Sequence, residues 1–153
     1  DSLWCALYPQ PDGNENIGLG EPGVQGNSRD LAIVSYGNGH YLSHQAARVL
    51  RREHGIRSRI VDLRWLAPLD ESQVINAVKP CRHVLVVDEC RQTGSQSEAL
   101  FTLFSERARW SPKLSRCTAA DTFIPLGKAA TLPLPSRDSI VAAALELVGT
   151  VTP

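Results

Sequence analysis

The chain has 153 residues, of which 42% are hydrophobic and 21% charged, and its 16 basic residues balance its 16 acidic ones. This length and apolar content suit one domain with one sizeable core. A net charge of zero, without a long run of one sign, argues against a nucleic-acid-binding protein, and no apolar run approaches the ~18 residues of a membrane helix.

The four cysteines do not form a metal-site or redox motif. Cys5, Cys81, Cys90 and Cys117 include no C-x-x-C pair, and no second ligand pair follows Cys81 and His83 at a zinc-site spacing. We therefore expect four reduced, mostly buried thiols in a reducing compartment.

Residues 1–29 are predicted to be a connector with one short edge strand around residues 20–25. They begin with an apolar cluster that contains Leu3, Trp4, Leu7 and Tyr8, without an initiator Met, and a high density of glycine and proline follows. Such a beginning suggests a piece of a longer protein.

Residues 30–150 are predicted to form one α/β domain. Strand patterns and helix patterns alternate, and the strands are apolar on both faces, which is typical of an α/β sandwich with a mainly parallel sheet and right-handed crossovers. A long, proline-containing surface segment is expected at 121–135. The predicted strands are 31–36, 60–63, 83–88 and 114–120, and the predicted helices are 40–54, 70–79, 95–108 and 138–148.

The stretch 57–70, which reads RSRIVDLRWLAPLD, is predicted to be the central strand of the sheet, followed by a loop and a helix start. Pro68 lacks the N–H that a sheet ladder needs, and it disfavours helical backbone at Ala67. Asp70 stands directly before an amphipathic run, where an N-cap is expected.

Ligands of parallel sheets bind beyond the carboxyl ends of the strands, so the candidate positions are 37–40, 62–64, 88–94 and 121. Gly37-Asn38-Gly39, with Asp62 further on, partly matches a dinucleotide-binding fingerprint, but Leu42 occupies the third glycine position. We interpret residues 37–39 as a plain tight turn.

His40 and His44 lie four residues apart on one face of a predicted helix. A hydrolytic zinc site would need a glutamate between them and a third ligand, and neither is apparent, so we interpret them as surface or interface histidines. The arginines that follow are interpreted as the solvated face of the helix and the entry to the next strand, not as a binding patch: Arg48, Arg51, Arg52, Arg57 and Arg59.

Three segments resemble the C-terminal domain of the transketolase superfamily, in particular the β subunit of the decarboxylating component of 2-oxo acid dehydrogenases. They are DLAIVSYG at 30–37, VDLRWLAPLD at 61–70 and VVDECRQTG at 86–94. DTFIP at 121–125, LPS at 134–136 and ALY at 6–8 fit the same pattern. Ser95 departs from it, because a second glycine often follows Gly94, and this leaves the fine shape of that loop open.

The resemblance implies a three-layer α/β sandwich with a five-stranded, mixed, mostly parallel sheet whose short first strand is antiparallel. Whole enzymes of this type use thiamine diphosphate and Mg²⁺ to decarboxylate a 2-oxo acid, of pyruvate or branched-chain type, and acylate a lipoyl group. Both cofactors bind between two other domains, so no residue here is predicted to be catalytic or to bind a cofactor or metal. The resemblance also implies a cytoplasmic protein, or one of the mitochondrial matrix in a eukaryote.

In this family the C-terminal domain is associated with subunit pairing and with docking of the dihydrolipoyl acyltransferase core. We expect the following residues to hold the loops at the strand ends: Asp62, Arg64, Pro68, Glu89, Thr93, Gly94 and Asp121. We expect a contact surface with a second β subunit at Trp4, Leu7, Tyr8 and Trp110, with His40, His44 and Arg48 as its polar rim. An autonomous α/β domain that binds a small ligand or nucleotide is the alternative.

Overall fold

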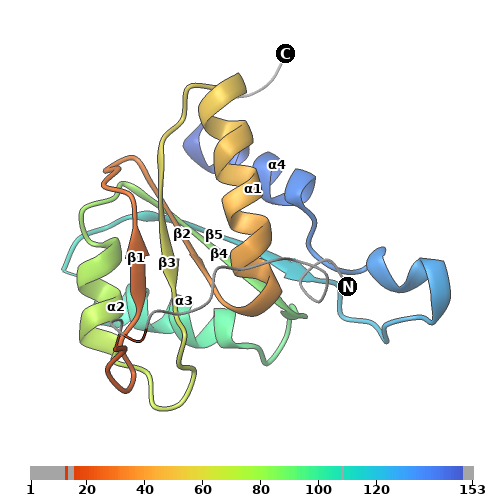
Figure 1. The fold of residues 1–153 in the computed structure, drawn as a ribbon, viewed down its shortest axis with the longest axis horizontal. Helices are drawn as coiled ribbons and strands as arrows, with labels where there is room; N and C mark the ends of the chain where they lie inside the picture. The colour runs from red at the N-terminus through yellow and green to blue at the C-terminus, as the bar shows by residue number, and fades with distance from the viewer. Residues whose placement is uncertain (1–12, 14–15, 108, 150–153) are drawn as a thin grey trace.

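The structure is a computed structural model that describes residues 13, 16–107 and 109–149. Its five strands are β1 (Gly23–Gln25), β2 (Leu31–Ser35), β3 (Ser58–Asp62), β4 (His83–Arg91) and β5 (Lys113–Ala119). Its helices are α1 (Gly37–Glu53), α2 (Glu71–Val78), α3 (Gln96–Arg107) and α4 (Arg137–Val148), with a 3₁₀ helix, η1, at Gly127–Thr131 (Figure 1). Among the described residues, no helix is both long and apolar enough to cross a membrane.

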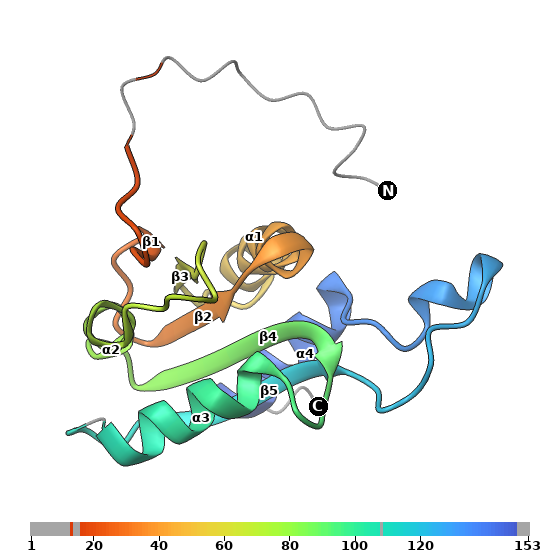
Figure 2. The ribbon, with the colours of Figure 1, turned by 90° about the horizontal axis from the view of Figure 1, so that it is seen from below.

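The sheet has the strand order β1-β3-β2-β4-β5, and only β1 is antiparallel to its neighbour. Helices α1 and α4 cover one face of the sheet, and α2 and α3 cover the other (Figure 2). This is the three-layer sandwich with a mixed, mostly parallel sheet that the sequence predicts, including its short antiparallel first strand.

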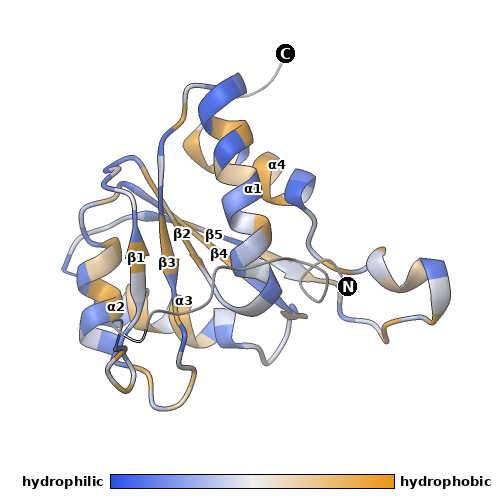
Figure 3. Ribbon diagram, in the orientation of Figure 1, coloured by the Kyte–Doolittle hydropathy of each residue, from blue (hydrophilic) through white to orange (hydrophobic). Residues whose placement is uncertain are grey.

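The core consists of two apolar clusters, one on each face of the sheet. Alternate residues of β2 explain the division, because Ala32 and Val34 face α2 and α3 whereas Leu31 and Ile33 face α1 and α4. Hydrophobic residues accordingly gather on the strands and on the inner sides of the helices, while the outer side of α1 is polar (Figure 3).

The prediction that stretch 57–70 holds the central strand is wrong. The middle strand is β2, which is buried along its whole length, and β3 lies between β2 and the edge strand β1. The physical reason is visible in the sequence of β3, because Ser58 and Arg59 begin it with polar side chains that a central strand would bury.

Two predicted boundaries also differ from the structure. Residues 37–39 do not form a separate turn, because α1 begins at Gly37, whose φ of +55° lets the chain pass directly from β2 into the helix. Strand β4 continues beyond Asp88 to Arg91, through an irregularity in its pairing with β5. The loop that contains Gly94 is therefore shorter than predicted.

Candidate functional site

The carboxyl ends of β2, β3 and β4 meet at one edge of the sheet, because these strands are parallel. The polar side chains beyond the ends of the strands lie in three groups. One group is centred on Asp88, one on the pair His40–His44 and one on Asp121, which follows β5.

The side chain of Asp88 is fully buried and ties three elements together. Its Oδ1 accepts hydrogen bonds from Tyr36 Oη at 2.5 Å and from the backbone N–H of Cys90 at 2.8 Å. Its Oδ2 accepts one from the N–H of Ser97, in the first turn of α3, at 2.8 Å. Burial and the hydrogen bond to Asp88 raise the pKa of Tyr36, so the phenol stays a neutral donor. This group fixes where α1 and α3 begin.

Glu89 accepts a hydrogen bond from Asn38 Nδ2 at 2.6 Å, and this contact joins the end of β4 to the first turn of α1. The Nε of Arg64, in the loop after β3, lies 4.0 Å from Asp62 Oδ2. The guanidinium of Arg64 covers Gly23, where a Cβ would lie 2.8 Å from it. The side chain of Arg64 therefore lies over the short strand β1.

Asp62 holds the loop after β3 through a backbone contact. Arg64 has a φ of +56°, and its N–H donates to Asp62 Oδ1 at 3.2 Å. Pro68 lies in the exposed part of this loop, after a cis peptide bond with Ala67. The loop-holding roles of all seven residues predicted for them stay predictions.

The histidines of α1 form a contacting pair beside Asp62. The Nε2 atoms of His40 and His44 are 3.2 Å apart, and His40 Nε2 lies 3.8 Å from Asp62 Oδ2. One ring must donate and the other accept, so the pair holds one fewer proton than two free imidazolium rings. Burial, His40 and the charge of Arg48 lower the pKa of His44. The two rings therefore form a hydrogen-bonded pair that resists protonation of His44.

The carboxylate of Asp121 accepts hydrogen bonds from the loop that follows β4. Thr93 donates to its carboxylate from the backbone N–H at 2.9 Å and from Oγ1 at 2.5 Å, and these hydrogen bonds lower the pKa of Asp121. Gly94 has a φ of +71°, and its N–H donates to Glu98 Oε2 at 2.8 Å. Thr93 and Asp121, which are far apart in the sequence, thus meet at the base of the segment 121–135.

The segment 121–135, which we call the arm, extends away from the rest of the fold with η1 at its far end (Figure 1). Its side chains include large apolar groups that face solvent: Phe123 is 96% exposed, Leu126 95% and Leu132 82%. The sequence analysis described the arm only as a surface segment and missed these residues. The signal in the sequence that could have indicated an exposed apolar surface was a set of apolar residues in a stretch without helix or strand periodicity.

The predicted contact surface with a second β subunit stays a prediction. Trp110 is half-buried against the core, and its Nε1 donates to the carbonyl oxygen of Cys81. Trp4, Leu7 and Tyr8 lie outside the described residues. Among the cysteines that the structure describes, 81 and 117 are buried and 90 is exposed.

These features define a three-layer α/β domain with a hydrogen-bonded polar edge and an apolar arm beside it. The family model of the transketolase C-terminal domain matches residues 20–134, and the chain belongs to that family. The family and the fold class that the sequence predicts are therefore confirmed.

Individual relatives agree with this assignment. A 1-deoxy-D-xylulose-5-phosphate synthase of Halothermothrix orenii is 30% identical over 135 residues, which cover 86% of this chain and 21% of the relative. The pyruvate dehydrogenase E1 component subunit beta of Staphylococcus aureus is 29% identical over 138 residues, which cover 89% of this chain and 42% of the relative. The chain thus spans less than half the length of either relative.

The fold is also similar to a solved structure of a split-gene transketolase, described as an inactive β4 tetramer. The TM-score is 0.76 at 22% sequence identity, over 92% of this chain and 46% of that chain. At this identity the likeness concerns the fold alone.

Proposed function

We propose that the chain is the C-terminal assembly domain of a thiamine-diphosphate-dependent 2-oxo acid dehydrogenase component. The whole enzyme would decarboxylate a 2-oxo acid, of pyruvate or branched-chain type, and transfer the acyl group to a lipoyl group, in the cytoplasm or the mitochondrial matrix. The pyruvate dehydrogenase relatives, each named as a subunit of an E1 component, support this proposal. In this account the domain serves association with a second β subunit and docking of the dihydrolipoyl acyltransferase.

The described residues do not fit thiamine diphosphate and Mg²⁺. In that part of the chain, no group of three or more His, Cys, Asp and Glu side chains is placed to hold a metal ion. The glycine-containing start of α1 does not form a phosphate cradle either, because Glu89 Oε2 lies 3.8 Å from the position of a Cβ on Gly37, and a carboxylate there would repel a diphosphate. We therefore assign both cofactors to other parts of the whole enzyme and derive no step through them.

The observation that carries the assembly role is the arm. Three large apolar side chains, Phe123, Leu126 and Leu132, are each more than four-fifths exposed on one projecting segment, and exposed apolar groups collected in one place mark a contact surface. The tie between Thr93 and Asp121 holds the base of the arm against the domain. We propose a second copy of the chain as the partner, in a two-fold pairing that brings the same surface of both subunits together.

The proposal is tested by sedimentation velocity of the purified protein over a concentration series. We expect self-association at concentrations of ~100 μM and below, and a monomer when Phe123→Ser and Leu126→Ser are combined. Leu19→Ser is the matched control, because Leu19 is 68% exposed but lies outside the arm, and this variant should associate like the wild type. Equal association of the wild type and the double variant would contradict the role of the arm.

A further inference from the structure

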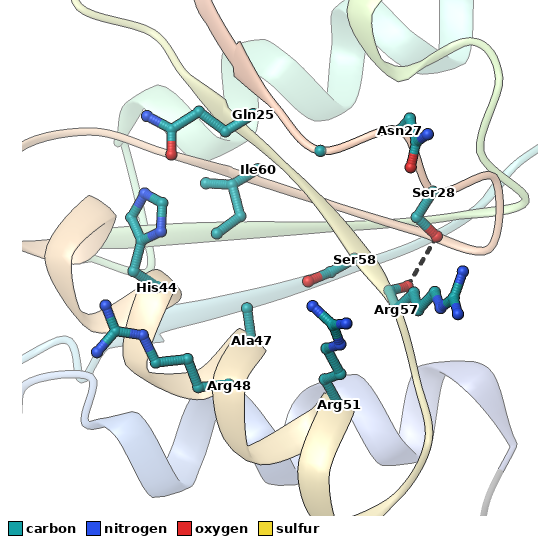
Figure 4. A pocket seen from close by; sticks show the side chains of 11 residues that line it. Gln25, Asn27, Ser28, His44, Ala47, Arg48, Arg51, Arg57, Ser58 and Ile60 are labelled. Atoms are coloured by element: carbon teal, nitrogen blue, oxygen red, sulfur yellow. Dashed lines mark hydrogen bonds between the residues drawn. The ribbon is translucent and has the colours of Figure 1, made fainter.

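A cleft of about 460 Å³ lies away from the arm, between α1 and the connector from β1 to β2 (Figure 4). Ala47 and Ile60 contribute apolar surface to it, and His44, Arg48 and Arg51 line it from α1. Arg57, directly before β3, completes its set of basic residues.

The cleft exists because β1 is short. Its three residues pair only with residues 60–62 of β3, so Ser58 and Arg59 lack a strand partner on their outer side. The connector passes close to this uncovered edge, and Gly26 permits the approach. Its φ is +82°, and a Cβ there would lie 3.0 Å from the carbonyl oxygen of Ser58. The walls of the cleft are therefore set by the fold.

The charge of the cleft is one-sided. Its lining includes three arginines and one histidine but no acidic residue. In the part of the chain that the structure describes, Arg48, Arg51 and Arg57 form no ion pair within 4.0 Å, whereas Arg64 and Arg116, for example, do. Like charges repel one another, and a concave surface focuses their field. Among the residues that the structure describes, these three cations thus share one cleft without an acidic side chain in its lining.

The basic side chains line different parts of the cleft. Arg48 lies beside His44 at one end of the cleft, and Arg51 reaches from the next turn of α1 toward Ser58 (Figure 4). Gln25, the last residue of β1, and Asn27, in the connector, also line the cleft and carry amide donors. Planar guanidinium groups bind phosphate oxygens with two parallel hydrogen bonds.

We propose that this cleft binds a small molecule that carries phosphate groups, held by Arg48, Arg51 and Arg57. The volume of the cleft lies within the range of small-molecule sites, which favours a small anion over an acidic protein surface. This site uses none of the arm residues, so it stands or falls independently of the proposed assembly role.

The test is calorimetric titration of the purified protein with pyrophosphate. We expect binding tighter than ~1 mM and a loss of about tenfold or more in the variant Arg51→Gln, which removes a charge-assisted contact. Arg52→Gln is the matched control, because Arg52 is an exposed neighbour on α1 that does not line the cleft. We expect this variant to change the affinity by less than about twofold, because the side chain of Arg52 does not line the cleft and its exposed charge is screened by salt.

A second readout locates the ligand. The ring signals of His44 in NMR spectra should shift when pyrophosphate binds, and the signals of the exposed His54 should not. Three outcomes would overturn the proposal: no pyrophosphate binding at ~1 mM, equal losses in Arg51→Gln and Arg52→Gln, or binding of a polyglutamate peptide without binding of pyrophosphate. The last result would make the cleft a surface for an acidic protein partner.

Discussion

Asp88 accepts hydrogen bonds from Tyr36 Oη and from the N–H groups of Cys90 and Ser97, and its side chain is fully buried. In the variant Asp88→Ala these donors lose their acceptor, and the buried N–H of Ser97 loses it without access to water. We expect the free energy of unfolding to fall by about 3 kcal/mol, measured by urea denaturation. Glu89→Gln, which keeps an acceptor for Asn38, should change it by less than about 0.5 kcal/mol. An unchanged denaturation midpoint in Asp88→Ala would contradict the role of Asp88.

His44 carries a prediction about pH. Its pKa lies below the ordinary 6.5 because of burial, the neighbouring His40 and the charge of Arg48. The unfolded chain therefore binds a proton at this side chain more readily than the folded chain does. Stability should be full above about pH 6.5 and should decrease as the pH falls from there toward the folded-state pKa.

The measurement is urea denaturation between pH 7.5 and 5.5, a range chosen to span the ordinary histidine pKa of about 6.5. The variant His44→Gln should lose stability less steeply than the wild type as the pH falls. His54→Gln, at the exposed C-cap of α1, should keep the slope of the wild type. Identical slopes in all three proteins would show that His44 does not contribute.

At the scale of elements, the start of α4 shows how local sequence fixes a helix that the core requires. Ser136 Oγ accepts from the N–H of Ser139 at 3.1 Å, and Ser139 Oγ accepts from the N–H of Ser136 at 2.8 Å. Ile140 and Ala144 of the helix that follows are fully buried, in the same core cluster as residues of α1. We expect Ser136→Ala to lower the free energy of unfolding by about 1 kcal/mol, whereas Ser136→Asp should keep most of it. Equal thermal midpoints for Ser136→Ala and the wild type would contradict the capping role.

The sequence was sufficient to predict the elements whose cause is local. Runs of apolar residues predicted β2 and β4, and Asp70 predicted the start of α2, where its side chain caps the helix. The strand order was not predictable in the same way, because β3 pairs with β1 on one side and β2 on the other, and the helix α1 separates it from both in the chain.

The residues of the candidate site were likewise predictable from the sequence only in part. The sequence indicated that Asp88, Thr93 and Asp121 lie at strand ends, because each follows a strand pattern. It did not reveal that the side chain of Asp88 is buried or that Thr93 donates hydrogen bonds to Asp121. The contacts of both aspartates join residues that are not neighbours in the chain. The exposure of Phe123 and Leu126 was also hidden, because an apolar side chain in sequence looks the same whether it is buried or faces solvent.

At the scale of the whole molecule, a neutral chain presents two surfaces of different character. The arm carries exposed apolar side chains without regular strand structure, and the cleft carries Arg48, Arg51 and Arg57 without a carboxylate. The core needs neither surface, because both apolar clusters are complete without them. A surface that the fold does not need for its own stability is where contacts with other molecules are expected.

Amide hydrogen exchange of the purified protein, at concentrations below and above self-association, tests whether the arm is the association surface. We expect exchange in residues 121–135 to slow in the associated state, while exchange around Trp110 and His54 stays the same. Association that leaves exchange in residues 121–135 unchanged would contradict it.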